Sequence, residues 1–136
     1  MADTTGQPLD LSSFGECSGV SDDGSLIVGV WNGEAFYHDG VSPTTLGTLF
    51  PDWVATATDV SEGGKRICGF DNQLLASEAW VWAESTGIER LSTKLQNLGV
   101  PGVPDSLGKP EKMTPDGQVI VGNTTFAGAW IVVLPL

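Results

Sequence analysis

VSDDGSLIVG (residues 20–29) recurs in two close copies, VSEGGKRICG (residues 60–69) and MTPDGQVIVG (residues 113–122). The copies align without a gap and share a hydroxyl residue, a turn glycine, an isoleucine and a second glycine. In each copy an apolar residue and the hydroxyl end one strand, and an alternating apolar run forms the next. Each copy therefore predicts a β-hairpin, in which glycine accepts the positive φ that the turn requires.

The repeat continues beyond the hairpin. After a loop of variable length, each copy reaches an alanine followed by an aromatic residue: Ala35-Phe36, Ala79-Trp80 and Ala129-Trp130. This pattern predicts a third strand whose aromatic residues belong to the core. Two copies add a fourth strand, at residues 45–49 and 87–91, and residues 8–11 have the alternation of a strand that could complete the last copy.

The sequence thus predicts an all-β fold of three four-stranded antiparallel repeats resembling propeller blades. The repeats span about residues 14–50, 54–99 and 108–136, within a single domain over residues 1–136. An offset in which one terminus completes the sheet begun by the other is typical of closed rings of such units.

One helical insertion is expected near residues 92–98. Ser92 can cap the helix, and Leu95 and Leu98 are expected to face the core. Gly99 follows as a stop signal. This insertion explains why the second and third copies lie further apart than the first and second.

Composition agrees with a small soluble domain. The 136 residues include 18 glycines and 8 prolines, which suits many short strands joined by tight turns. With 17 acidic and 6 basic residues the net charge is −11, so phosphate backbones and anionic lipids would be repelled. We therefore expect neither nucleic-acid binding nor membrane insertion, and the polar residues 1–7 predict no export signal.

The repeated residues resemble a known family. The unit VSDDGSLIVG, followed by EAFYHDG and TTLGTL, is similar to the HAF repeats, and KMTPDGQVIVGNTTFAGAWIVVLPL looks like the terminal repeat of such proteins. The resemblance covers most of residues 17–134. It implies propeller-blade-like units and a surface or extracellular location, and it implies no established chemistry. A virus particle is a further possibility, because its components reach the outside without a signal peptide.

The number of units creates a conflict, because a propeller typically needs four to eight blades. Two chains forming a six-bladed ring would resolve it. A β-trefoil-like pseudo-threefold domain is the alternative fold.

Few residues suggest chemistry. His38 is the only histidine and is expected at the surface, because a general base or a metal ligand would need partners. Asp22-Asp23-Gly24 is better explained as a turn than as a calcium site, since the other copies lose the ligands. Cys68 occupies the position of Val28 and is expected to be a small buried hydrophobe, and the sequence leaves a disulfide with Cys17 open. We expect no catalytic residue, metal or cofactor.

Two tryptophans differ from those of the core. Trp31 and Trp53 fall in turns or connectors, beside Asn32 and Asp52. Exposed tryptophan near amides and carboxylates can stack on a sugar ring or anchor a protein partner, although capping the core is the other explanation. These four residues are the candidate binding site.

The sequence therefore predicts a non-catalytic structural or interaction module of an extracellular assembly or a virus particle. It would act by self-association as a homo-oligomer or by docking on a larger protein scaffold. The alternative is a carbohydrate-binding, lectin-like module that recognises a surface glycan. A glycosidase comes third, because no carboxylate pair is marked by its spacing.

Overall fold

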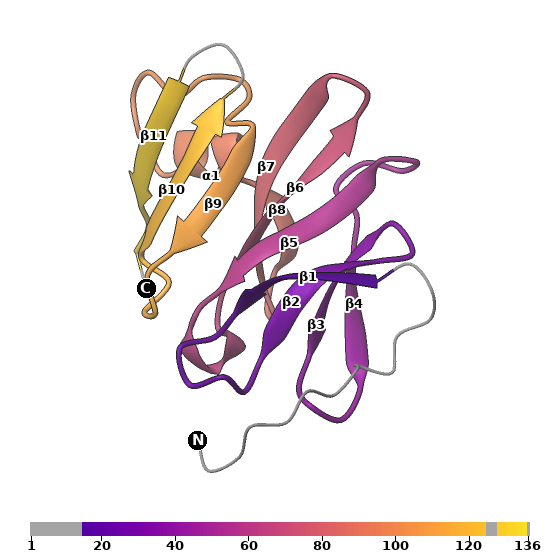
Figure 1. Cartoon of the computed structure of the whole chain (residues 1–136). Coiled ribbons are helices and arrows are strands. Elements are labelled where there is room, and N and C mark those ends of the chain that lie inside the picture. The colour runs from indigo at the N-terminus through magenta and orange to yellow at the C-terminus, as the bar shows by residue number, and fades with distance from the viewer. Residues whose placement is uncertain (1–14, 125–127, 136) are drawn as a thin grey trace.

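The computed structural model describes residues 15–124 and 128–135, which form three antiparallel sheets (Figure 1). The first sheet contains, in order, β1 (Gly15–Val20), β2 (Ile27–Trp31), β3 (Glu34–His38) and β4 (Pro43–Gly47). The second contains β5 (Val54–Val60), β6 (Ile67–Gln73), β7 (Ala76–Ala83) and β8 (Gly87–Arg90). The third contains β9 (Lys109–Met113), β10 (Val119–Thr124) and β11 (Gly128–Val133), with β10 central. The all-β prediction is confirmed; the strand expected at residues 8–11 lies outside the described residues.

The three predicted hairpins share one hydrogen-bond pattern. In each, the N–H of the hydroxyl residue donates to the carbonyl five positions later, and the hydroxyl oxygen accepts the N–H of that same residue. The pairs are Ser21 with Leu26, Ser61 with Arg66 and Thr114 with Val119. The turn glycines have φ values of 76°, 68° and 77° at Gly24, Gly64 and Gly117. The recurring letters therefore encode one turn geometry.

The second repeat glycine makes room for an aromatic ring. Gly69 on β6 lies opposite Trp80 on β7, and a Cβ at Gly69 would overlap both the indole ring and the carbonyl of Thr56. In the third sheet Gly122 stands in the same relation to Trp130. A side chain larger than hydrogen would displace the ring from its place on the sheet.

Each sheet has two faces that alternate along its strands. We call the forward face the one that contains Val28, Ala35 and Tyr37 in the first sheet, Cys68, Ala79 and Val81 in the second, and Val121, Ala129, Ile131 and Val133 in the third. The rear face contains Ile27 and Phe36, Ile67 and Trp80, and Ile120 and Trp130, respectively.

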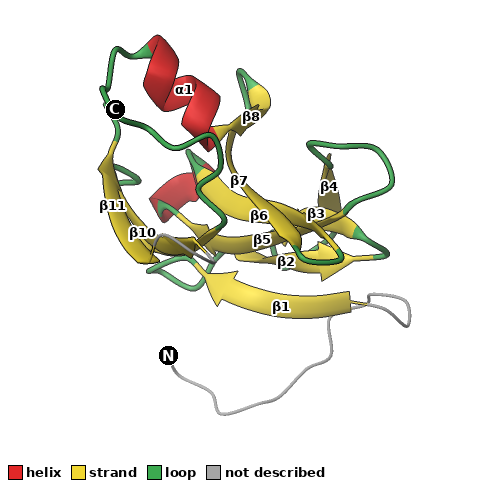
Figure 2. Ribbon diagram, turned by 90° about the horizontal axis from the view of Figure 1, so that it is seen from above, coloured by secondary structure: helices red, strands yellow, loops and turns green. Residues whose placement is uncertain are grey.

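The sheets stack with the forward face of one against the rear face of the next. Val28 and Ala35 of the first sheet share a buried cluster with Ile67 and Trp80 of the second. Cys68, Ala79 and Val81 of the second share another cluster with residues of the third, among them Met113, Ile120 and Val132. Figure 2 shows the third sheet at one end of this stack. The core is therefore two layers of side chains between three sheets.

Polar contacts tie the second and third sheets together. Asp59 on β5 accepts a hydrogen bond from the backbone N–H of Met113 (2.7 Å). The 3-10 turn η1 (Glu62–Gly64) between β5 and β6 donates from Glu62 N–H to the carbonyl of Pro115 (2.7 Å). The two hairpin turns consequently lie side by side, at the lower left of Figure 1.

The predicted helix is present as α1 (Leu91–Asn97), but two details of the prediction were wrong. Arg90, not Ser92, is the residue before the first turn; Ser92 lies inside the helix, where its hydroxyl donates to the carbonyl of Asp105 (3.0 Å). Leu98 is 50% exposed because the helix ends before it. Gly99, with φ of 82°, ends the helix as predicted.

We predict that Gly69→Ala lowers the free energy of unfolding by roughly 2–3 kcal/mol, because the added methyl group overpacks the site beneath Trp80. Gly40→Ala is the matched control: Gly40 also carries no side chain, its surroundings are open and its φ is 92°. The control should cost about 1 kcal/mol of backbone strain. Urea unfolding measures both, and equal losses would contradict the role assigned to Gly69.

Candidate functional site

The candidate residues Trp31 and Asn32 lie at the end of the β2–β3 hairpin. Trp31 is the last residue of β2 and is half-buried. Asn32 and Gly33 form the two-residue turn, with φ of 52° and 82°, which is the pairing that a type I′ turn favours. The carbonyl of Gly33 accepts the N–H of Ala55 (2.9 Å), so the turn is held against the start of β5.

Asp52 and Trp53 lie in the connector that leads into β5. Asp52 is exposed with φ of 68°, and Trp53 is half-buried with its ring 4.8 Å from that of Phe50. The structure therefore brings the two predicted segments to the same end of the first and second sheets. Each tryptophan has part of its surface covered, and ligand binding at these four residues stays a prediction.

A buried carboxylate holds this connector. Asp71 on β6 accepts hydrogen bonds from the Trp80 indole N–H (3.0 Å) and from the backbone N–H of Phe50 (2.8 Å). Burial raises the pKa of Asp71, while the hydrogen bonds from Phe50 and Trp80 oppose that rise. The carboxylate thus positions both the core tryptophan and the connector that carries Trp53.

The expectation of a surface location for His38 was wrong. His38 is 4% exposed at the end of β3, where its ring lies on the rear face together with Phe36. Its Nδ1 accepts the backbone N–H of Gly40 (2.9 Å), which closes the β3–β4 turn. A ring nitrogen that satisfies a turn N–H can be buried without an unsatisfied polar group, and this explains the location.

The carboxylates of the acidic turns accept hydrogen bonds from residues of the same turn. Asp23 accepts hydrogen bonds from Ser25 and Ser21, and Asp116 accepts them from Thr114 and Gln118. These bonds hold the pKa of each carboxyl below its usual value. Within the part of the chain that the structure describes, no three His, Cys, Asp or Glu side chains gather closely enough to hold a metal ion.

The two cysteines are both free thiols. Cys68 is completely buried between the second and third sheets, as predicted, and burial raises the pKa of its thiol to about 12. Cys17 lies on the exposed strand β1 of the first sheet. The disulfide that the sequence left open is therefore absent from the structure.

We predict that a thiol reagent such as DTNB modifies one cysteine per native chain within minutes, and the second only after unfolding, because the thiolate is the nucleophile. Cys17→Ser should remove the fast reaction and leave the slow one. Rapid modification of the native Cys17→Ser variant would contradict the burial of Cys68.

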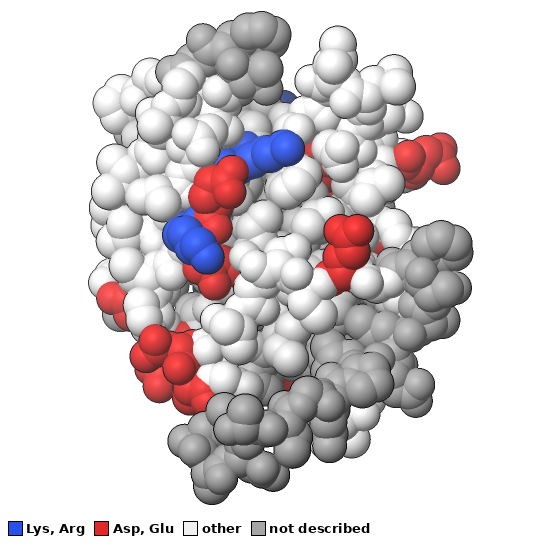
Figure 3. Space-filling model, viewed as in Figure 1, with Lys and Arg blue, Asp and Glu red and all other residues white. Residues whose placement is uncertain are grey.

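The forward face of the third sheet is an exposed apolar surface. Val121, Ile131 and Val133 are 39%, 67% and 66% exposed, whereas Val28 and Cys68, the counterparts of Val121 in the other two sheets, are completely buried. In Figure 3 the surface over β10 and β11, at the upper left, carries no Lys, Arg, Asp or Glu, and charged side chains gather over the neighbouring β9. An open hollow of about 460 Å³ lies on this face, lined partly by Ala129 and Ile131.

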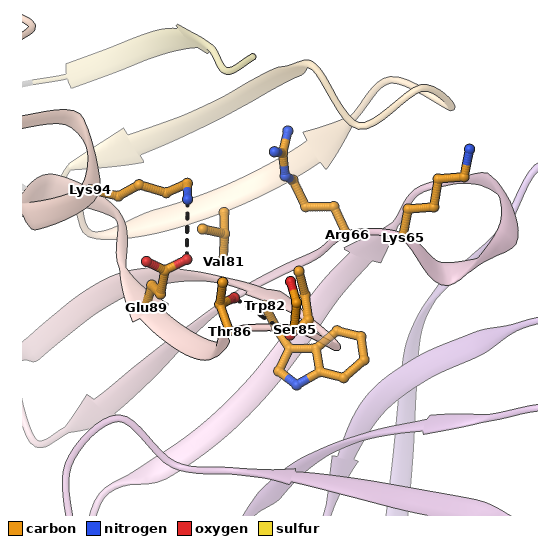
Figure 4. Close-up of a pocket in the computed structure, with 9 residues that line it drawn as sticks. Lys65, Arg66, Val81, Trp82, Ser85, Thr86, Glu89 and Lys94 are labelled. Atoms are coloured by element: carbon orange, nitrogen blue, oxygen red, sulfur yellow. Dashed lines mark hydrogen bonds and ion pairs between the residues drawn. The ribbon is translucent and has the colours of Figure 1, made fainter. Parts of the chain in front are cut away.

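A second hollow, which we call the basic pocket, lies between the second sheet and α1 (Figure 4). It has a volume of about 450 Å³ and combines basic, hydroxyl and apolar side chains. Its lining residues are Lys65, Arg66, Val81, Trp82, Ala83, Ser85, Thr86, Glu89 and Lys94. This pocket was not predicted from the sequence, because Lys94 is far along the chain from Lys65 and Arg66. The available signal was that 3 of only 6 basic residues lie here.

Three contacts hold the charged side chains of the basic pocket in place. The Arg66 guanidinium donates to the carbonyls of Gly117 and Pro135, the latter at 2.9 Å, so it is anchored to the third sheet's turn and the end of the chain. Lys94 on α1 donates to Glu89 on β8 at 3.1 Å. Desolvation lowers the pKa of Arg66, and the charge of Glu89 opposes that shift.

Comparison of the chain with protein-family models, with curated proteins and with solved structures gives no match. Across residues 15–124 and 128–135, the structure contains no helix with the length and apolar character needed to cross a membrane.

Proposed function

We propose that this chain is a non-catalytic interaction module that self-associates through the forward face of its third sheet. One observation carries the proposal: Val121 and Ala129, which are exposed on this face, occupy repeat positions that are completely buried in the other two sheets. Both covered faces pack on a sheet of the same repeat type. The forward face of the third sheet is therefore best suited to packing against another sheet of this type.

The partner is a second copy of the chain, joined by a two-fold axis. The face is suited to pairing with itself, because its centre is formed by β-branched apolar residues, and Glu111 on β9 is the one acidic residue among those that line its hollow. The rear face of the first sheet is a poorer partner, since Phe36 and His38 on it are already buried. This arrangement replaces the six-bladed ring of two chains, which would need that rear face to be open.

The energetics favour a weak to moderate dimer. Complete burial of an aliphatic side chain contributes about 1.5–3 kcal/mol, and Ile131 and Val133 would each lose their exposed two-thirds on both copies. The resulting gain is roughly 4–8 kcal/mol before the entropic cost of association, which corresponds to affinities no tighter than about micromolar. Such an affinity suits a subunit that is concentrated in an assembly.

The wider setting belongs to the same proposal. The resemblance to HAF repeats favours a surface or extracellular location, and the stacked sheets, with β1, β5 and β9 leading each one, resemble successive propeller blades. A virus particle is a second setting of the same proposal. The buried titratable groups support a non-catalytic role, because Asp59, Asp71 and His38 each bond to backbone or indole N–H groups that position turns and sheets.

We predict that the wild type sediments as a mixture of monomer and dimer at about 1 mM, and that Ile131→Glu is a monomer at the same concentration. The variant buries no carboxylate in the free chain, because Ile131 is 67% exposed, so its thermal unfolding should be unchanged. Val41→Glu is the matched control: Val41 is 88% exposed on the β3–β4 turn, away from the face, and the variant should stay dimeric. A wild type that is monomeric at about 1 mM would overturn self-association and leave a separate scaffold as the occupant.

A mixing experiment separates the two-fold contact from a head-to-tail one. Tagged Ile131→Glu should capture no untagged wild type if both third sheets meet, whereas a head-to-tail contact would still give mixed dimers.

Because each chain is strongly acidic, the dimer affinity should also rise with salt concentration, as the Debye length falls from about 30 Å to about 8 Å. In the capture experiment, mixed dimers of Ile131→Glu and wild type would contradict the two-fold arrangement.

A further inference from the structure

The basic pocket is an anomaly in an acidic chain. Net charge is −11, yet Lys65, Arg66 and Lys94 face one hollow that contains a single carboxylate, that of Glu89. Three cations against one anion leave this hollow positively charged. A surrounding acidic surface repels anions in general, so the pocket would select those that are small enough to enter it.

The cations differ in how much freedom they have. Arg66 uses two of its N–H groups on backbone carbonyls, and this fixes the plane of its guanidinium while other N–H donors remain. Lys94 has an ion pair with Glu89, and its side chain is 24% exposed. Figure 4 shows the Lys94 ammonium and the Glu89 carboxylate meeting at one side of the pocket and Arg66 and Lys65 rising at the other.

The rest of the lining matches a hydroxylated organic body better than a bare inorganic ion. Val81 and Ala83 supply apolar surface, and Ser85 and Thr86 supply hydroxyls at the β7–β8 turn. The Trp82 indole points to the rear face of the second sheet, where its ring centroid lies 5.9 Å from that of Tyr37, so its ring does not form the apolar wall of the pocket. The volume of about 450 Å³ falls within the range of small-molecule pockets, about 300–1,000 Å³.

We propose that the basic pocket binds a small carboxylate-bearing ligand of the sugar-acid class. The carboxylate lies between Lys94 and Arg66, the hydroxyls reach Ser85, Thr86 and Glu89, and the C–H face of the ring lies on the apolar wall. Binding here is independent of the third sheet's forward face, because the two surfaces share no lining residue.

Glu89 gives the proposal an unusual signature. Its carboxylate competes with the ligand for Lys94, so removing each member of the pair should change affinity in opposite directions. Glu89→Gln frees the ammonium and removes a repelling charge, whereas Lys94→Gln removes the attraction and leaves the carboxylate unpaired. A purely structural ion pair would respond to both variants only through stability.

The test is titration calorimetry with D-glucuronate as the probe and D-glucose as its uncharged counterpart. We expect glucuronate to bind at millimolar or tighter affinity and glucose much more weakly. Lys94→Gln should weaken glucuronate binding roughly tenfold, as expected for loss of a charge-assisted hydrogen bond, and Glu89→Gln should tighten it. Lys112→Gln, an exposed lysine on β9 outside the pocket, is the matched control and should leave affinity unchanged.

The absence of binding heat at glucuronate concentrations up to about 10 mM, which is ten times a millimolar Kd, would overturn the proposal. Equal affinities for glucuronate and glucose would also overturn it, as would equal effects of Lys94→Gln and Lys112→Gln on glucuronate affinity. The monomeric Ile131→Glu variant should still bind glucuronate. Folding of the pocket variants is checked by thermal unfolding, and neither substitution touches Arg66, whose contacts with Gly117 and Pro135 join two sheets.

Discussion

The structure depends on one constraint: each sheet has two apolar faces, and an apolar face is stable in water only when something covers it. In the first and second sheets the cover is the following sheet, and the alanines Ala35, Ala57 and Ala79 at those contacts allow the backbones to approach closely. Because the sheets stack in one direction, the forward faces of the first and second sheets are both covered by the next sheet. It also means that the stack has an end, and the end is where the exposed valines and isoleucine of the third sheet lie.

The local architecture could be predicted because it depends on neighbours in sequence. A hydroxyl that accepts the N–H five positions later, and a glycine at positive φ, need only a short segment, so the three hairpins were visible in the sequence. The short helix was visible as well, but its start was misplaced. Ser92 is a common capping residue, yet here its hydroxyl is used by Asp105, which lies 13 residues away and follows a loop that no local pattern describes.

The candidate sites were harder to predict, because they depend on contacts between sheets. His38 had the sequence neighbours of a surface residue, and only the pairing of β3 with β2 and β4 shows that its ring lies beside Phe36. Trp31 and Trp53 are half-buried, as Trp130 is, and only Trp80 of these four tryptophans is completely buried. The contact between Gly33 and Ala55 and the contact between the Phe50 and Trp53 rings, which cover the two connectors, could not be predicted from sequence neighbours. The basic pocket is formed by the turn before β6, by β7, by β8 and by α1, so no spacing rule could have predicted it.

The exposed face of the third sheet is best understood by comparison with β1, another edge strand of this chain. The sequence of β1, GECSGV, places Glu16, Cys17 and Ser18 where water reaches them. Thr44 and Thr45 do the same on β4. Strand β11 instead places Ile131 and Val133 in water, although polar side chains would fit an extended strand equally well. Because an edge strand with apolar side chains invites association unless a partner covers it, the difference between β1 and β11 is the physical reason to expect a partner on the third sheet and not on the first.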